Sequence, residues 1–119
     1  MSIPLRIAFR GMATSPAVVA RIREWTGNLE TAFDRVLFCD VVVEEPHRHH
    51  RRGRQFHVGI VLTVPGGKTI AVSRDPGPDE THEDVYVAVR DTFRAARRRL
   101  QDRARRLRGD VKRRRGGTS

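Results

Sequence analysis

The sequence predicts an α+β two-layer sandwich in the order β-α-β-β-β-α, with a four-stranded sheet and both helices on one of its faces. Four segments alternate apolar and polar residues with the period of two that is typical of strands. Two others repeat apolar residues every three or four positions, as amphipathic helices do. The 119 residues fit a single domain that buries a real core without disulfides or metal.

The first strand and helix are expected before residue 34. Residues 5–10 alternate apolar side chains with arginine or alanine, which predicts a strand with one apolar face. Ser15 followed by Pro16 is typical of an N-cap and a first helical position. The apolar stripe of this helix, roughly four to five turns long, consists of Val18, Ile22, Trp25, Leu29 and Phe33.

Three further strands follow. Residues 36–45 are rich in β-branched side chains, and the inner face is expected to hold Leu37, Cys39, Val41 and Val43. From Phe56 to Val64 every second residue is apolar, and the Pro-Gly-Gly turn that follows predicts a hairpin with residues 69–73.

The second helix follows a loop over residues 74–84 that is rich in proline, glycine and acid. Thr81 with Asp84 resembles a capping box. The apolar stripe consists of Tyr86, Val89, Phe93, Ala96 and Leu100. Beyond Leu100 the stripe fades, so the helix is expected to project past the core. We therefore expect a domain over residues 1–108 and a basic, disordered tail over residues 109–119.

The net charge of +10 is confined to the last quarter of the chain. Residues 1–89 hold eleven basic and eleven acidic residues, whereas residues 90–119 hold thirteen basic and three acidic ones. All but two of the 24 basic residues are arginine, which binds phosphate through two parallel hydrogen bonds and stacks on bases.

Arginines flank the apolar stripe of the second helix over most of its length. The flanking row is Arg90, Arg94, Arg97, Arg105 and Arg108, widened by Arg98, Arg99, Arg103 and Arg106. A solvated helix face normally mixes the two signs of charge, but Asp91 and Asp102 are the only acids between residues 90 and 109. The row therefore predicts an anionic partner.

RNA is the partner that the pattern favours. No apolar run approaches the ~20 residues of a membrane span, and the modest apolar stripe of the second helix is needed by the sheet. The topology lacks the two short helices of a helix-turn-helix DNA reader. Without an aromatic pair on the exposed sheet for base stacking, recognition of RNA is expected through shape and phosphates.

Catalysis and metal binding find little support. A lone Cys39 on an inner strand face is expected to be a buried, unreactive thiol, and a single cysteine suits a reducing, cytoplasmic location. The loop with His47, His49 and His50 also carries Arg48, Arg51, Arg52 and Arg54, which would repel a metal dication. This loop is expected to be solvated, or to touch RNA phosphates. We expect no enzyme activity, metal, cofactor or small-molecule substrate.

Three segments together resemble the ribosome hibernation-promoting factors, also called ribosome-associated inhibitor or subunit-interface proteins. They are residues 29–36 at the end of the first helix, residues 62–67 at the hairpin and residues 84–89 at the start of the second helix. The resemblance spans residues 3–107 and implies a fold like that of double-stranded-RNA-binding domains with an extra first strand. It implies binding to the small ribosomal subunit and its rRNA, in the cleft for mRNA and tRNA, and inhibition of translation in stress or stationary phase.

The resemblance also suggests which residues contact rRNA. Arg98 falls on a basic position typical of the family, and Arg90, Arg94 and Arg97 share its helix. Basic positions usual on the first helix are here Trp25 and Asn28, and the nearest replacements are Arg21 and Arg23. The acidic loop 75–83 is expected to face away from RNA, and the chain resembles the short form without a C-terminal dimerisation domain. The alternative function is a general RNA-binding or RNA-chaperone module that is not specific to the ribosome.

Overall fold

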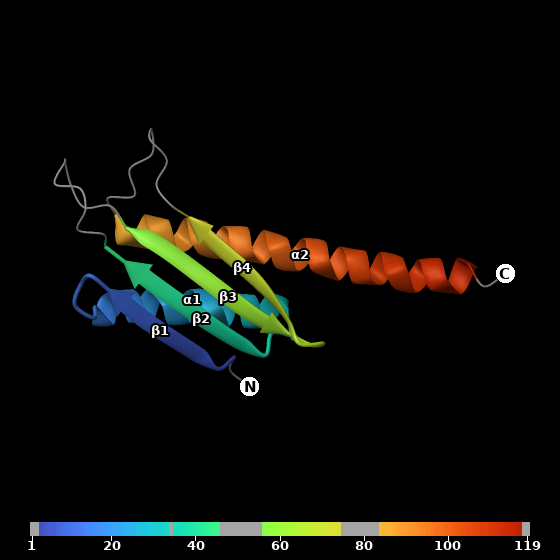
Figure 1. The fold of residues 1–119 in the computed structure, drawn as a ribbon, viewed down its shortest axis with the longest axis horizontal. Coiled ribbons are helices and arrows are strands. Elements are labelled where there is room, and N and C mark those ends of the chain that lie inside the picture. The colour runs from blue at the N-terminus through green and yellow to red at the C-terminus, as the bar shows by residue number, and fades with distance from the viewer. Residues whose placement is uncertain (1–2, 34, 46–55, 75–83, 118–119) are drawn as a thin grey trace.

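The computed structural model describes residues 3–33, 35–45, 56–74 and 84–117, and the predicted element order is confirmed (Figure 1). The elements are β1 (Leu5–Arg10), α1 (Pro16–Ala32), β2 (Phe38–Glu44), β3 (His57–Val64), β4 (Lys68–Arg74) and α2 (Val85–Gly117). The predicted loops over residues 46–55 and 75–83 lie outside the described residues.

The four strands form one mixed sheet in the order β1-β2-β3-β4. β1 runs parallel to β2, since α1 supplies the crossover that a parallel pair needs, and the other two pairs are antiparallel. The β3–β4 connection is the predicted hairpin turn. Gly66 and Gly67 adopt φ values of 91° and 70° there, a region that L side chains rarely enter.

Both helices cover one face of the sheet and lie side by side on it (Figure 1). The register places Leu5 opposite Cys39, and Leu62 opposite both Cys39 and Ile70, so one side-chain row crosses all four strands toward the helices. The inward side chains of β2 and β3 are at most 2% exposed: Cys39, Val41, Val43, Val58, Ile60, Leu62 and Val64. The single apolar face expected of each strand is thus the face that the helices bury.

The start of β2 differs from its prediction. The strand begins at Phe38, two residues later than expected, and Leu37 is 53% exposed although the alternation placed it inside. Val36 is buried instead, at 6%. The strict alternation of strand side chains holds only within the paired ladder, and Val36 and Leu37 precede it.

Side chains cap the starts of both helices. Ser15 is the N-cap of α1, where the Val18 N–H donates to its Oγ at 3.3 Å, as the sequence predicts. At α2 the Tyr86 N–H donates to the Asp84 Oδ1 at 2.9 Å, so Asp84 itself precedes the helix as a cap. The proposed box placed Asp84 inside the first turn, which is wrong; Thr81 lies outside the described residues.

Helix α2 extends well past the core (Figure 1). Leu100 is 4% exposed and Leu107 is 46% exposed, so burial ends between them. The backbone remains helical to Gly117, where the sequence predicts a disordered tail from residue 109. Arginine and lysine favour helices, and no proline interrupts the segment. From Leu100 to the helix end, α2 extends roughly 25 Å at 1.5 Å per residue.

Candidate nucleic-acid interface

The arginines of α2 fall on three faces, because successive helical residues are 100° apart. Opposite the buried face lies a ridge of exposed residues, Arg94, Arg98 and Arg105. Within the described part of the chain, Arg94 and Arg98 have no hydrogen-bond or ionic partner, and Arg105 has only Asp102, with 3.6 Å between Nη2 and Oδ1. We call these three residues the arginine ridge; their guanidinium groups are available to an external anion.

Two predicted contact residues, Arg90 and Arg97, lie nearer to α1 and are partly engaged within the protein. The Arg97 Nη1 donates to the Asn28 Oδ1 of α1 at 2.6 Å. The Arg90 Nη2 lies 3.1 Å from the Asp91 Oδ1. Both side chains are half-buried. A guanidinium carries five N–H donors, so Arg97 can serve Asn28 and still offer donors to a phosphate.

A third group of arginines lies toward β4. Arg99 and Arg106 are exposed, and the Arg99 Nη1 lies 3.5 Å from the Ala71 carbonyl oxygen. From the sequence, these residues are expected only to widen the row. The sequence feature that points to this third group is the fading of the apolar stripe after Leu100, because a helix without a buried stripe exposes more of its circumference to a partner.

Helix α1 contributes less positive charge to this surface. Arg21 lies over the Tyr86 ring at 5.3 Å from its centroid and 3.8 Å from the Glu24 carboxylate, so a neighbouring acid partly neutralises it. Arg23 is exposed. Trp25 stacks on Phe93 with 6.2 Å between ring centroids. Trp25 and Asn28, which stand where basic residues were expected, therefore connect α1 to α2.

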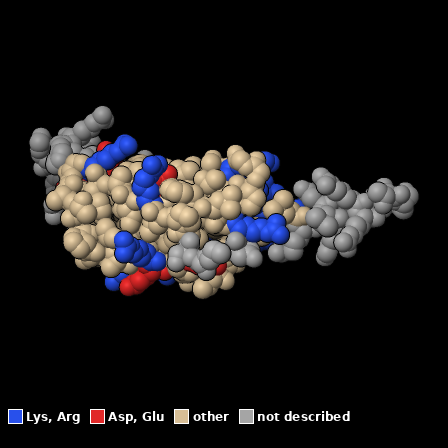
Figure 2. All heavy atoms as spheres, turned by 90° about the horizontal axis from the view of Figure 1, so that it is seen from below, with Lys and Arg blue, Asp and Glu red and all other residues tan. Residues whose placement is uncertain are grey.

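Figure 2 shows that positive charge is concentrated on α2 and mixed with negative charge elsewhere on this face. Basic side chains gather at the end of the body where α2 leaves it, whereas blue and red atoms lie next to one another over the rest of this face. The predicted contacts Arg48, Arg51, Arg52 and Arg54 lie outside the described residues, and so does the side chain of Arg108.

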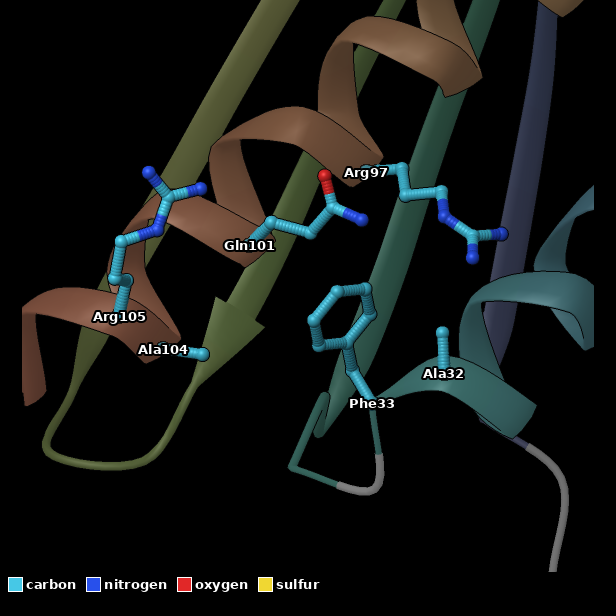
Figure 3. A pocket seen from close by; sticks show the side chains of 6 residues that line it. All are labelled: Ala32, Phe33, Arg97, Gln101, Ala104 and Arg105. Carbon is cyan, nitrogen blue, oxygen red and sulfur yellow. The ribbon is translucent and has the colours of Figure 1, made fainter. Parts of the chain in front are cut away.

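A groove opens beside this surface where α2 runs past the end of α1 (Figure 3). Its volume is about 470 Å³. From α1 and its C-cap come Ala32 and Phe33, and α2 contributes Arg97, Gln101, Ala104 and Arg105. In the close-up, the Phe33 ring and the Gln101 carboxamide project into the same space from the two helices.

Features of other site classes are few in the described ranges. Cys39 is fully buried, as predicted, and burial raises the pKa of its thiol to about 12, which keeps it protonated and a poor nucleophile. No cluster of three or more metal-ligating side chains occurs among the residues with described positions, from which His47, His49 and His50 are excluded. No described helix combines the length and apolarity that crossing a bilayer requires.

Solved structures share this fold. A ribosomal subunit interface protein from Coxiella burnetii matches with a TM-score of 0.69 and 14% identity, over 86% of this chain and 98% of that one. The N-terminal domain of Protein Y from Thermus thermophilus matches with a TM-score of 0.64 and 16% identity, over the same shares of the two chains. No curated protein sequence matches the chain.

The sequence itself decides the family. Residues 5–108 match the family described as sigma 54 modulation protein / S30EA ribosomal protein, which covers almost all of the fold. The resemblance to subunit-interface proteins drawn from the three sequence segments is thereby confirmed. The chain belongs to the sigma 54 modulation protein / S30EA ribosomal protein family.

Proposed function

We propose that this protein binds the small ribosomal subunit through its rRNA, in the channel for mRNA and tRNA, and inhibits translation in stress or stationary phase. The observation that carries this proposal is the arginine ridge, whose residues are exposed and, among described neighbours, nearly without partners. Like charges at this density destabilise an isolated helix, and an anionic partner removes that penalty.

The shape of α2 suits a phosphate backbone. Arg94 and Arg105 are about 16 Å apart along the helix axis at 1.5 Å per residue, and Arg98 lies between them. A row of guanidinium groups on a rigid rod can follow several phosphates without reading bases. The family membership directs this chemistry to the ribosome, and the Coxiella burnetii protein of the same fold is a ribosomal subunit interface protein.

The body around the rod has a mechanical role in this proposal. The α1 and sheet contacts fix α2 as far as Leu100, and the remaining helix projects into solvent. A body 33 × 20 Å in its two shorter dimensions would occupy the channel while the projecting helix contacts rRNA. We propose a non-catalytic, cytoplasmic factor whose effect is steric exclusion of mRNA and tRNA.

Co-sedimentation tests the proposal. Purified protein is centrifuged with small subunits, large subunits or whole ribosomes, with and without excess tRNA. We expect stoichiometric binding to small subunits and whole ribosomes, displaced by tRNA, and dose-dependent inhibition of translation in a cell-free system. Equal affinity for small subunits, large subunits and unrelated structured RNA would instead support a general RNA-binding module.

A further inference from the structure

The groove between α1 and α2 is large enough to hold a small ligand. Its volume of about 470 Å³ lies within the roughly 300–1,000 Å³ that small-ligand sites occupy. Ala32 and Ala104 have short side chains, and between them the half-buried Phe33 ring borders the open space. An aromatic ring that lines a basic groove offers a stacking platform.

The polar groups around that ring complement a nucleotide. Gln101 offers both a hydrogen-bond donor and an acceptor, which is what the edge of a base requires. Arg97 and Arg105 project on either side of Gln101 and can bind phosphate oxygens (Figure 3). The hydrogen bond of 2.6 Å from Arg97 to Asn28 holds one of these guanidinium groups in place.

We infer that the groove binds one unpaired base of an RNA strand, with the base stacked on Phe33, its edge against Gln101, and the flanking phosphates on Arg97 and Arg105. Unpaired RNA bases are commonly stacked on aromatic side chains and hydrogen-bonded at their edges. The inference rests on the proposed function only in naming rRNA as the source of the strand. It adds a single-stranded contact to an interface otherwise made of phosphate contacts.

RNA fits the lining better than an acidic peptide does. A peptide carboxylate would use the two arginines, but it would leave the aromatic face and the carboxamide without matching groups. A base uses all four side chains at once. The distinction can be measured, because a carboxylate ligand depends on charge alone and a base depends on the flat ring.

Binding of short RNAs to the full chain tests the inference. Fluorescence anisotropy compares a labelled eight-nucleotide single strand with a hairpin duplex in wild type and in Phe33→Leu, which stays apolar and loses the flat ring. Phe38→Leu on β2 makes the same change on the opposite sheet face. We expect Phe33→Leu to weaken single-strand binding at least about fivefold and duplex binding less than about twofold. Phe38→Leu should change neither.

A second variant guards against a folding defect, because Phe33 packs partly on the core. Gln101 is exposed, so Gln101→Ala should leave the thermal midpoint unchanged and still weaken single-strand binding about threefold or more. A 4-thiouridine probe in the single strand should cross-link to the peptide that holds Phe33 or to the one that holds Gln101. Cross-links found only elsewhere would overturn the inference.

The outcomes separate this inference from the proposed function. Single-strand affinity that is unchanged in both groove variants overturns the groove site, whether or not ribosomes are bound. Displacement of the strand by an acidic peptide, with equal affinity in wild type and Phe33→Leu, also overturns it. Groove-dependent RNA binding by a protein that fails to sediment with small subunits supports the groove site and contradicts the proposed function.

Discussion

Removing two arginines from the ridge should weaken RNA binding by an amount that can be estimated. In Arg94→Gln/Arg98→Gln the side chains stay long and polar, and neither has a partner among described residues, so folding should be unaffected. Each lost phosphate contact lowers the slope of log affinity against log salt by about 0.7–0.9. Two contacts lower it by about 1.4–1.8, which makes binding roughly 25- to 60-fold weaker at 0.1 M salt.

The assay is a salt titration of small-subunit binding between 0.05 and 0.3 M, together with thermal melts. Arg10→Gln is the matched control, because Arg10 is exposed and lies on the face of β1 that the helices do not cover. If net charge alone sets affinity, Arg10→Gln will produce half of the change seen in the double variant. We expect it to produce almost none. An unchanged salt slope in the double variant would refute the assignment of the ridge as the rRNA contact.

Three further predictions concern the fold and the helix extension. Ser15→Ala should lower stability by about 1 kcal/mol and the thermal midpoint by about 4 °C through loss of the bond to the Val18 N–H, whereas Ser15→Asp should restore the cap. Cys39 should resist thiol reagents until the protein unfolds. Because burial raises the pKa of its thiol from 9.0 to about 12, the unfolded state loses the thiol proton at lower pH than the folded state does. The free energy of unfolding should therefore fall above pH 9 by up to about 1.4 kcal/mol per pH unit. Alkaline urea titrations check this slope, which Cys39→Ala should reduce by the same amount. A chain ended after Leu107 should keep its thermal midpoint and lose small-subunit affinity, since it lacks five basic residues and keeps every buried residue of the described core, which ends at Leu100. Equal affinity would show that the extension does not bind.

Sequence periodicity was sufficient for the architecture because each element buries one apolar stripe. The alternation from Phe56 to Val64 placed every inner residue of that segment correctly, and Ser15-Pro16 marked the start of α1. Periodicity gave wrong predictions for some residues that lie outside a paired ladder or a buried core. Leu37 precedes the paired part of β2, and the helical backbone past Gly109 depends on backbone propensity without any stripe to reveal it.

The site was predicted at the level of the helix, and the structure separates its members. Sequence spacing gave Arg90, Arg94 and Arg97 the same rank, because all three follow the apolar stripe by one residue. Whether a guanidinium is free depends on residues distant in sequence, and the Asn28 partner of Arg97 is 69 positions away. The groove was not predicted for the same reason, since it exists only where the end of α1 meets the middle of α2.

Among the side chains that the structure describes, positive charge is carried mainly by one helix, and the contacts between α1 and α2 explain how that is possible. Trp25 and Asn28 stand where the family resemblance led us to expect basic residues, and each holds α2 in place, through Phe93 and through Arg97. A rod that projects roughly 25 Å beyond the core can position its arginines only if its base is rigid. With Trp25 and Asn28 at these positions, α1 carries less positive charge but holds α2 in a fixed orientation. Trp25→Lys adds a positive charge to α1 but removes the ring that stacks on Phe93. This variant should consequently lower the thermal midpoint clearly and strengthen RNA binding only slightly. Thermal melts and salt titrations of the variant measure the two effects.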